Sequence, residues 1–600
     1  MNPTQYPATA ASAQADGWPF LVIRHTMGVN NLPDFFGQLA DCHRRHPGAC
    51  DEFWFATGSR KTISALEKEC ETFARYRPVC DEIGVMPSYQ QGLTLGHGVA
   101  HDGPPKPDSQ AFPEDAWQVG RDGQRLGFLC PRSPFVLDYE FNYAKTVLRV
   151  ANPGSYWIDD DLRLGVCKPE GCFCDRCIAA FNAKTGRNWT RETLVARLFS
   201  DAPREPLRAA WIDFNAESLA VYAAKVREAA DALGSRCRLA YQAVWADTIY
   251  TGYDTKPILK ALSGPKGKPV GIRPGAGFYT EAEPRGMVFK CLSVAREAER
   301  CRVLSPCSGD LSGKAALNGP QGRLNAAEGG LVASICYEQE TYPRHVLHKS
   351  PGAIMTECAL ALASGCDSLS LYWYAGEAPE PIEEYDRFVR TLATARPYFE
   401  RLAASTRRTH LGGVARFVGS AAAETPDFDL RDQKDFDLAC AGVPVTVAES
   451  GTKVWYLTDK SRREMTEADQ AALATGAIVE VDDIGKYPLS SRRTKLLDDL
   501  DAVTDGTFPV RIDACRPLRI LPRVRDDGRL DSVTILNLSI GDTDELKIRV
   551  RRPVSPKASL QTTKMALPIP VVCEASGLLG EYVITLDDLQ GWQAATLFFD

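Results

Sequence analysis

The sequence predicts an α/β protein: a (β/α)8 TIM barrel, then a small flavodoxin-like α/β domain, then a C-terminal β-sandwich. Three observations predict this order. Short apolar runs alternate with amphipathic helical stretches over 17–403, which is the pattern of a barrel. A shorter strand–helix alternation fills 404–511. Runs of alternating apolar and polar residues, punctuated by Pro and Gly, fill 512–600. The polar segment 1–16 predicts a flexible tail without the basic and apolar regions of a signal peptide.

Eight apolar runs predict the barrel strands, and helical patterns separate many of them. The runs are 20–23, 52–55, 83–86, 155–158, 238–241, 270–272, 333–336 and 368–371. The helical patterns are 60–77, 206–233, 286–300, 352–364 and 380–402. A doubly wound sheet is the alternative, but the Gly-rich phosphate turn typical of that fold is not visible after an early strand.

Size, charge and composition exclude several classes of protein. A chain of 600 residues is too long for one core, and 44% hydrophobic with 24% charged residues is typical of globular proteins. The net charge of −7 without a basic run makes nucleic acid and anionic membrane poor partners. The sequence contains no apolar stretch of about 18 residues, so we expect no membrane span. Without an export signal we expect a cytoplasmic protein, with most of its 19 cysteines buried and reduced.

Polar residues follow the predicted strands, at the end of a barrel where active sites lie. Asp159, Asp160 and Asp161 follow the fourth strand, and Glu338 and Glu340 end the seventh. Carboxylates from two strands, with amides and aromatics around them, indicate a sugar site, because a glycosidase needs one carboxyl group as acid and another as nucleophile or base. The other residues at strand ends are Arg24, His25, Gln90, Gln91, Gln242, Trp245, Arg273, Trp373 and Glu377.

Four cysteines lie between residues 167 and 177, three of them as Cys172-x-Cys174-x-x-Cys177. A structural zinc site needs four ligands, and the triplet supplies three. Cys167 is a nearby candidate for the fourth ligand and Cys130 a distant one. Clustered thiols in a reducing compartment bind metal more often than they form disulfides, although a cluster of plain buried thiols is the alternative.

Several short motifs are similar to those of a known family. They are Cys130-Pro131-Arg132-Ser133-Pro134, Asp159-Asp160-Asp161, Cys172 to Cys177 followed by Ala179-Ala180-Phe181, Glu340-Thr341-Tyr342-Pro343, Lys349-Ser350-Pro351-Gly352 and Ala363-Ser364-Gly365-Cys366-Asp367. In these motifs the chain resembles the family 42 glycoside hydrolases, largely β-galactosidases, of the retaining (β/α)8 superfamily. That family also follows its barrel with an α/β domain that helps to form trimers and then with a small β domain.

The resemblance implies roles for particular residues. It implies a structural zinc held by Cys130, Cys172, Cys174 and Cys177, no organic cofactor, and a homo-oligomer such as a trimer. It also implies Glu340 as nucleophile and Asp161 as acid/base. The chain departs from the family at Asp160-Asp161, where the family has Asn-Glu. The shorter acid withdraws its carboxyl group by roughly 1.5 Å, and a misplacement of about 1 Å costs about a hundredfold in rate.

We therefore expect a closer strand, or Asp160 as the acid, or a different reaction. Because three adjacent carboxylates repel one another, at least one should have a raised pKa. The predicted function is a glycoside hydrolase, β-galactosidase-like and retaining, that acts on a small oligosaccharide or glycoside. Glu338 is the reserve nucleophile or a partner of Glu340. The predicted substrate-binding residues are Asp159, Gln242, Arg273, Trp373 and Glu377.

Two rival hypotheses keep the barrel but change the function. The first is a catalytically silent carbohydrate-binding protein, which the altered Asp160-Asp161 pair supports. The second is a hydrolase whose carboxylates hold a catalytic metal. Only His25 and His97 lie near the predicted strand ends, and the sequence has no paired His motif, which speaks against the second.

Overall fold

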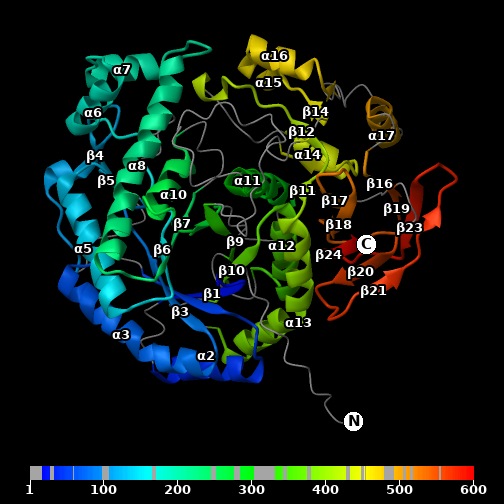
Figure 1. The fold of residues 1–600 in the computed structure, drawn as a ribbon, viewed down its shortest axis with the longest axis horizontal. Helices are drawn as coiled ribbons and strands as arrows, with labels where there is room; N and C mark the ends of the chain where they lie inside the picture. Colours follow the sequence, from blue (N-terminus) through cyan, green and yellow to red (C-terminus); the bar gives the residue numbers. More distant parts are fainter. Residues whose placement is uncertain are drawn as a thin grey trace.

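The structure is a computed structural model of the 600-residue chain (Figure 1). It describes residues 17–600 except for a set of internal segments, and the predicted tail 1–16 lies outside the described residues. The excepted segments are 27–32, 58–59, 98–106, 165–170, 245–251, 276–283, 303–330, 342–347, 375–379, 427–432, 448–451, 453, 479–491, 505–507, 514–517 and 553–555.

Eight parallel strands close into a barrel in the order β1-β10-β9-β8-β7-β6-β3-β2. The predicted barrel is thereby confirmed. The strands are β1 (Leu21–Thr26), β2 (Glu52–Ala56), β3 (Met86–Gln91), β6 (Ser155–Ile158), β7 (Arg238–Gln242), β8 (Val270–Arg273), β9 (Val332–Glu340) and β10 (Ser368–Tyr372). A two-stranded antiparallel ribbon, β4 (Trp117–Val119) and β5 (Arg125–Leu129), stands apart from the barrel sheet.

The third barrel strand begins later in the chain than predicted. Residues 83–86 read as an apolar run, but Ile83 ends α3 (Ile63–Glu82) and Gly84 follows with a φ of +68°. A left-handed glycine is a common stop after a helix, so the chain can extend only beyond it. The strand consequently runs from Met86 to Gln91, so Gln90 lies within the strand and not after it.

Helices surround the barrel, and one of them is mostly apolar and buried on all sides. In α12 (Pro351–Ser364), Ala353 to Ser364 are all buried. This helix lies between the barrel and the C-terminal sheets (Figure 1), and Thr356 Oγ1 donates to Trp592 O at 2.7 Å. The others are α2 (Pro33–Arg45), α5 (Pro134–Val150), α6 (Asp175–Thr185), α7 (Arg191–Leu198), α8 (Pro206–Ala232), α10 (Thr255–Ser263), α11 (Pro284–Arg302), α13 (Ile382–Arg407) and the short η1 (Glu114–Ala116).

The amino-terminal end of the barrel is filled by aromatic rings. Trp54 and Trp157 lie with ring centroids 4.2 Å apart, and Trp18 meets Trp157 edge-on at 6.3 Å. Beside them the buried Glu52 accepts from Ser155 Oγ at 2.6 Å and pairs with Arg238 at 3.0 Å. This packed layer leaves the opposite, carboxyl-terminal end of the strands for polar side chains.

After the barrel the chain forms a parallel sheet of four strands in the order β13-β12-β14-β15. The α/β pattern predicted for this region is present. Its strands are β12 (Val414–Arg416), β13 (Val445–Thr446), β14 (Val454–Tyr456) and β15 (Ala477–Ile478). Its helices are α14 (Gln433–Cys440), α15 (Asp459–Glu464), α16 (Glu467–Leu473), α17 (Arg492–Val503) and η3 (Ala422–Glu424).

Two antiparallel sheets share one buried apolar core at the end of the chain. The first has the order β11 (His410–Leu411), β17 (Leu518–Val524), β18 (Leu530–Asn537), β24 (Gln593–Phe599), β20 (Ala558–Thr562) and β21 (Ile569–Val571). The second has the order β16 (Val510–Asp513), β19 (Leu546–Arg551), β23 (Glu581–Leu586) and β22 (Glu574–Ala575).

The flavodoxin-like and β-sandwich assignments, and the domain limits 17–403, 404–511 and 512–600, stay predictions. Across the described residues, no helix is both long enough and apolar enough to span a membrane.

Candidate active site

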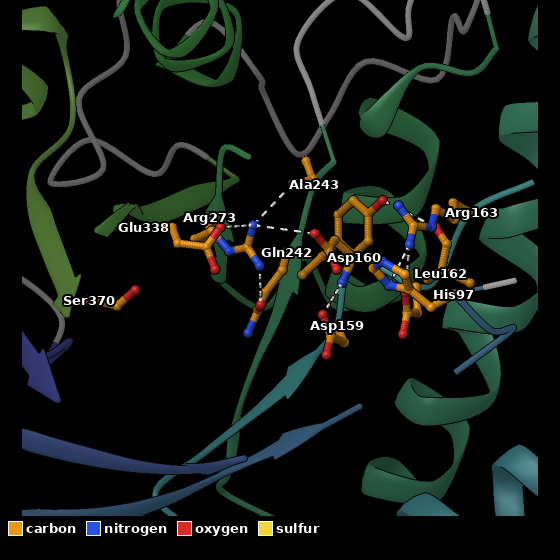
Figure 2. Close-up of polar contacts among 12 residues, drawn as sticks. His97, Asp159, Asp160, Leu162, Arg163, Gln242, Ala243, Arg273, Glu338 and Ser370 are labelled. Atoms are coloured by element: carbon orange, nitrogen blue, oxygen red, sulfur yellow. Dashed lines mark hydrogen bonds and ion pairs between the residues drawn. The ribbon is translucent and has the colours of Figure 1, made fainter. Parts of the chain in front are cut away.

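The inward-facing residues at the carboxyl-terminal ends of the barrel strands form one polar cluster (Figure 2). Side chains alternate along a strand, so the residues two apart on β6 and β9 share the inner face. The cluster joins Asp159 and Asp160 after β6 to Gln242 of β7, Arg273 of β8 and Glu338 of β9. Asp159, Asp160, Gln242, Arg273 and Glu338, all named from the sequence, therefore lie close together, whereas Trp245 lies outside the described residues.

Glu338 lies between two buried arginines. Arg24 Nη1 donates to its Oε1, and Arg273 Nη1 lies 2.7 Å from its Oε2. The Glu338 side chain is only 7% exposed. Burial raises the pKa of Glu338, although Arg273 and Arg24 both oppose the rise. Arg24 also stands over the Tyr372 ring at 4.5 Å, so it too is held in place.

Asp159 and Asp160 have opposite electrostatic surroundings. Asp160 Oδ2 lies 3.7 Å from Arg273 Nη1, whereas Asp159 forms no ion pair with any residue that the structure describes. Burial and the charges of Asp160 and Asp161 raise the pKa of Asp159 well above its ordinary value. Burial also works against the charge of Asp160, but Arg273 and neighbouring groups outweigh it and lower the pKa of Asp160.

Asp161 turns away from this pair and is held by two basic side chains, His97 and Arg163. Its Oδ1 lies 2.7 Å from His97 Nδ1 and 2.9 Å from Arg163 Nη2. The Asp161 side chain is buried, while that of His97 is 43% exposed. The hydrogen bond with Asp161 raises the pKa of His97. The carboxylate of Asp161 is thus committed to ion pairs.

Glu340 ends β9 and is half-buried, in contrast to Glu338 two residues earlier. It lies opposite Tyr372 in the register of β9 and β10. Its carbonyl oxygen accepts from Lys349 Nζ at 3.3 Å. By the alternation of the strand its side chain shares the inner face with Glu338. Arg24 interacts electrostatically with Glu338, Glu340 and Asp159, so these three carboxyl groups lie in the field of one guanidinium.

Two buried glutamines offer polar atoms to a ligand. Gln90 Nε2 donates to Asp159 Oδ2 at 3.2 Å, and Gln242 Oε1 accepts from Arg273. Within the described part of the chain, neither Gln90 Oε1 nor Gln242 Nε2 has a hydrogen-bond partner. Hydroxyl groups both donate and accept hydrogen bonds. Hydroxyl groups of a ligand would therefore satisfy this unpaired acceptor and this unpaired donor.

Two predicted binding residues do not join the described site. Trp373 is buried with its ring against Phe388 at 3.6 Å and Tyr385 at 5.5 Å. We therefore assign Trp373 to the core between β10 and α13 and withdraw the sugar-stacking role. The reason is that residue 373 follows the strand on its outer side, where α13 packs. Glu377 lies outside the described residues.

Four cysteines form a buried cluster beside the barrel. Cys130 follows β5, and Cys172, Cys174 and Cys177 lie before and within the first turn of α6. Their sulfur atoms are all within 4.8 Å of one another. Cys130 Sγ lies 3.8 Å from Cys174 Sγ and 3.6 Å from Cys177 Sγ. Tetrahedral ligands with metal–sulfur bonds of about 2.3 Å stand about 3.8 Å apart, so the set fits a metal ion. The alternative ligand Cys167 lies outside the described residues.

The residues that hold Asp161 could hardly be predicted from the sequence. Arg163 follows it by two positions, and a basic residue so close to three carboxylates is the only signal that the sequence offers. From the sequence, His97 is only one of two histidines near the predicted strand ends, whereas the structure pairs it with Asp161. Gln90 was noted at a strand end and proves to contact Asp159.

The fold is shared with solved structures of glycoside hydrolases. The α-L-fucosidase isoenzyme 2 from Paenibacillus thiaminolyticus matches with a TM-score of 0.57 and 11% identity over 97% of this chain and 99% of its own. A β-galactosidase from Bacillus circulans sp. alkalophilus matches with a TM-score of 0.58 and 8% identity over 97% and 99%. The exo-carrageenase GH42 from Bacteroides ovatus matches at 0.52 and 9% over 98% and 83%. Neither a protein-family model nor a curated protein sequence matches the chain.

Proposed function

We propose that this chain is a glycoside hydrolase that cleaves the glycosidic bond of a small oligosaccharide or glycoside by a retaining double displacement. The glycosidase fold supports the proposal. The observation that carries it is the arrangement of Asp159, with its raised pKa, and Glu340 around the guanidinium of Arg24. This reaction needs one carboxyl group as proton donor and a second as nucleophile.

Glu340 is the nucleophile in this proposal. Both oxygens of Glu338 are taken by arginines and its side chain is almost fully buried, so it cannot approach an anomeric carbon. Glu340 is half-buried at the very end of β9. Glu338 instead holds Arg24 and Arg273 in place.

Asp159 is the acid/base in this proposal, in place of Asp161. A general acid must carry a proton at the working pH. Asp161 is committed to Arg163 and His97, and Asp160 is kept ionised by Arg273 and its neighbours, whereas Asp159 lacks an ion-pair partner among the described residues. The family resemblance instead implies Asp161 as the acid/base, with Asp160 as the alternative. Mutants of Asp159 and Asp161 distinguish the two assignments.

The reaction then has two steps. Glu340 attacks the anomeric carbon while Asp159 gives its proton to the leaving oxygen, which breaks the glycosidic bond and forms a glycosyl ester. The Asp159 carboxylate next takes a proton from water, whose oxygen attacks the anomeric carbon. Glu340 is released and Asp159 is again protonated.

The remaining polar residues bind the sugar in this proposal. Gln242 Nε2 donates to a hydroxyl group and Gln90 Oε1 accepts from one, which satisfies the two unpaired atoms. Asp160 and Arg273 bind a further hydroxyl group. The β-galactosidase among the matched structures makes β-galactosides the first substrates to test.

We further propose that Cys130, Cys172, Cys174 and Cys177 hold a structural zinc ion. Four buried thiols form a closed ligand set without room for a substrate, which is typical of structural rather than catalytic zinc. The ion would join the segment after β5 to the start of α6 and takes no part in the reaction. The predicted homo-oligomer, a trimer by resemblance, and the cytoplasmic location stay proposals; sedimentation of the purified protein and cell fractionation test them.

A panel of nitrophenyl and alkyl glycosides tests the function with wild type, Glu340→Ala, Asp159→Asn and Asp161→Asn. We expect Glu340→Ala to abolish turnover. The rate at which Asp159→Asn turns over alkyl glycosides should fall about 10²- to 10⁴-fold. Its rate on nitrophenyl glycosides should fall much less, because their leaving groups need little protonation. Asp161→Asn should have the smaller effect on both. Asp526→Asn, at an exposed aspartate of the C-terminal region, is the matched control.

Two results would contradict the proposal. Full activity of Glu340→Ala excludes Glu340 as nucleophile. A wild type that binds sugars but never turns over a glycoside supports the alternative of a silent carbohydrate-binding protein.

A further inference from the structure

Behind the candidate nucleophile lies a buried cluster of three residues, Lys349, Glu357 and Tyr337, which we call the Lys349 cluster. Lys349 Nζ lies 2.7 Å from Glu357 Oε2, and the two side chains are 0% and 1% exposed. Tyr337 OH donates to Glu357 Oε1 at 2.7 Å. Both oxygens of Glu357 are therefore occupied.

The Lys349 cluster lies on the side of β9 that faces away from the barrel interior. Glu338 contacts Arg24 and Arg273 inside the barrel, so Tyr337, one residue earlier, faces outward to Glu357 of α12. The cluster thus touches the strand that carries Glu340 without touching the site where a sugar would bind.

Lys349 connects this cluster to Glu340 directly. Its Nζ donates to the carbonyl oxygen of Glu340 at 3.3 Å. The next amide, Thr341 N, donates to Tyr372 O of β10 at 3.1 Å. These two bonds hold both polar groups of the peptide that joins Glu340 to Thr341, at the point where β9 ends.

Stability alone does not account for charged groups in this place. The attraction within a buried ion pair often does not offset the free energy that its two charges lose when they leave water. Apolar residues of similar volume often give a core the same stability or more. The rest of α12 around Glu357 is mostly apolar and buried. The bond to the Glu340 carbonyl is the feature that apolar residues could not supply.

We propose that Lys349 is a positioning residue for the nucleophile, held by Glu357 and Tyr337 so that the end of β9 directs Glu340 at the anomeric carbon. The inference rests on the proposed function of Glu340. It assigns a role in the first chemical step to a lysine that does not touch the substrate.

The test is Lys349→Met, assayed by steady-state kinetics and by the rate of the pre-steady-state burst on a nitrophenyl glycoside. Loss of the bond frees the end of β9, and a displacement of about 1 Å costs about a hundredfold in rate. We expect kcat and the burst rate to fall about tenfold to a hundredfold. KM should change little, because the sugar-binding residues stand on other strands.

Folding defects are separated from positioning by a second variant and two controls. Lys349→Met alone leaves Glu357 buried without its partner, whereas the double variant with Glu357→Leu removes both charges. We expect the double variant to recover thermal stability but not the burst rate. Tyr337→Phe keeps the Lys349–Glu357 ion pair, so its burst rate should fall only a few-fold. Arg416→Met breaks the Arg416–Glu464 pair, which is also buried but lies in the α/β region after the barrel, and should lower stability without changing the burst rate.

A double variant with the wild-type burst rate would overturn the positioning role while the proposed function stands. A drop in the burst rate as large in Arg416→Met as in Lys349→Met would also overturn it. If the wild type turns over no glycoside, the proposed function fails and this inference fails with it.

Discussion

Glu140 should be protonated at neutral pH, and this can be tested by replacing it with Gln. The residue is fully buried on α5. Gln91 Nε2 donates to its Oε2 at 2.8 Å and Tyr222 OH donates to the same atom, while Oε1 has no partner among the described residues. Burial raises the pKa of Glu140 to about 8, even though these hydrogen bonds oppose the rise.

The size of the effect follows from the pKa. A rise of the Glu140 pKa from 4.5 to about 8 corresponds to about 5 kcal/mol of folding free energy, which is present at low pH and lost at high pH. Below about pH 4.5 the carboxyl group is protonated in both the folded and the unfolded state, and its contribution is complete. As the pH rises from 4.5 to 8 the unfolded state ionises first, so that stability is lost at about 1.4 kcal/mol per pH unit. Glu140→Gln cannot ionise and escapes this loss.

Infrared difference spectroscopy measures the protonation directly. The carbonyl band of a protonated carboxyl group should be present at pH 7, disappear near pH 8 and be absent from Glu140→Gln. In denaturant unfolding, the variant should gain stability relative to wild type between pH 5 and 8. Glu114→Gln, at an exposed residue, should show no such gain. A difference between Glu140→Gln and wild type that is constant over this range would refute the reasoning.

Three further predictions concern the zinc site, the core and the histidine. Purified protein should contain about one zinc ion per chain, as metal analysis will show, and Cys174→Ser should lose it; a variant that keeps its zinc would contradict the ligand set. Trp373→Ala should lower the unfolding free energy by about 3–5 kcal/mol with little change in KM, because its ring packs on Phe388; a large rise in KM would restore the sugar-stacking role. NMR titration should give His97 a pKa above 6.5 that falls in Asp161→Asn, because the Asp161 hydrogen bond favours the charged ring; an unchanged pKa would contradict the pairing.

Much of the site could be predicted from the sequence because a barrel has a simple rule. Parallel strands bring their carboxyl ends to one side, so residues that follow separate strands, such as Asp159 and Arg273, must approach one another. The same rule places Glu338 near Asp159, although the two are 179 positions apart in the chain. The association of Cys130 with Cys174 came from the resemblance to a family, because no local pattern joins residues 44 positions apart.

The roles within the site could not be predicted, because they depend on partners that the sequence does not pair. Asp159, Asp160 and Asp161 are chemically alike and adjacent, and only the positions of Arg273, Arg163 and His97 distinguish them. Glu338 and Glu340 likewise look alike in the sequence, and the structure distinguishes them by the greater burial of Glu338 and by its ion pairs with Arg24 and Arg273. Trp373 follows the eighth strand and is therefore predicted to bind the sugar, but α13 packs against its ring.

The central claim is that Glu340 forms a covalent bond to the sugar. Incubation with a 2-deoxy-2-fluoro glycoside that has an activated leaving group should trap the glycosyl ester, because the fluorine slows its hydrolysis. Digestion and mass spectrometry of the trapped protein then locate the sugar. The account predicts one sugar per chain on the peptide that contains Glu340, and none in Glu340→Ala. A sugar on Glu338 or on an aspartate of residues 159–161, or a wild type that turns over a glycoside with inversion, would contradict it.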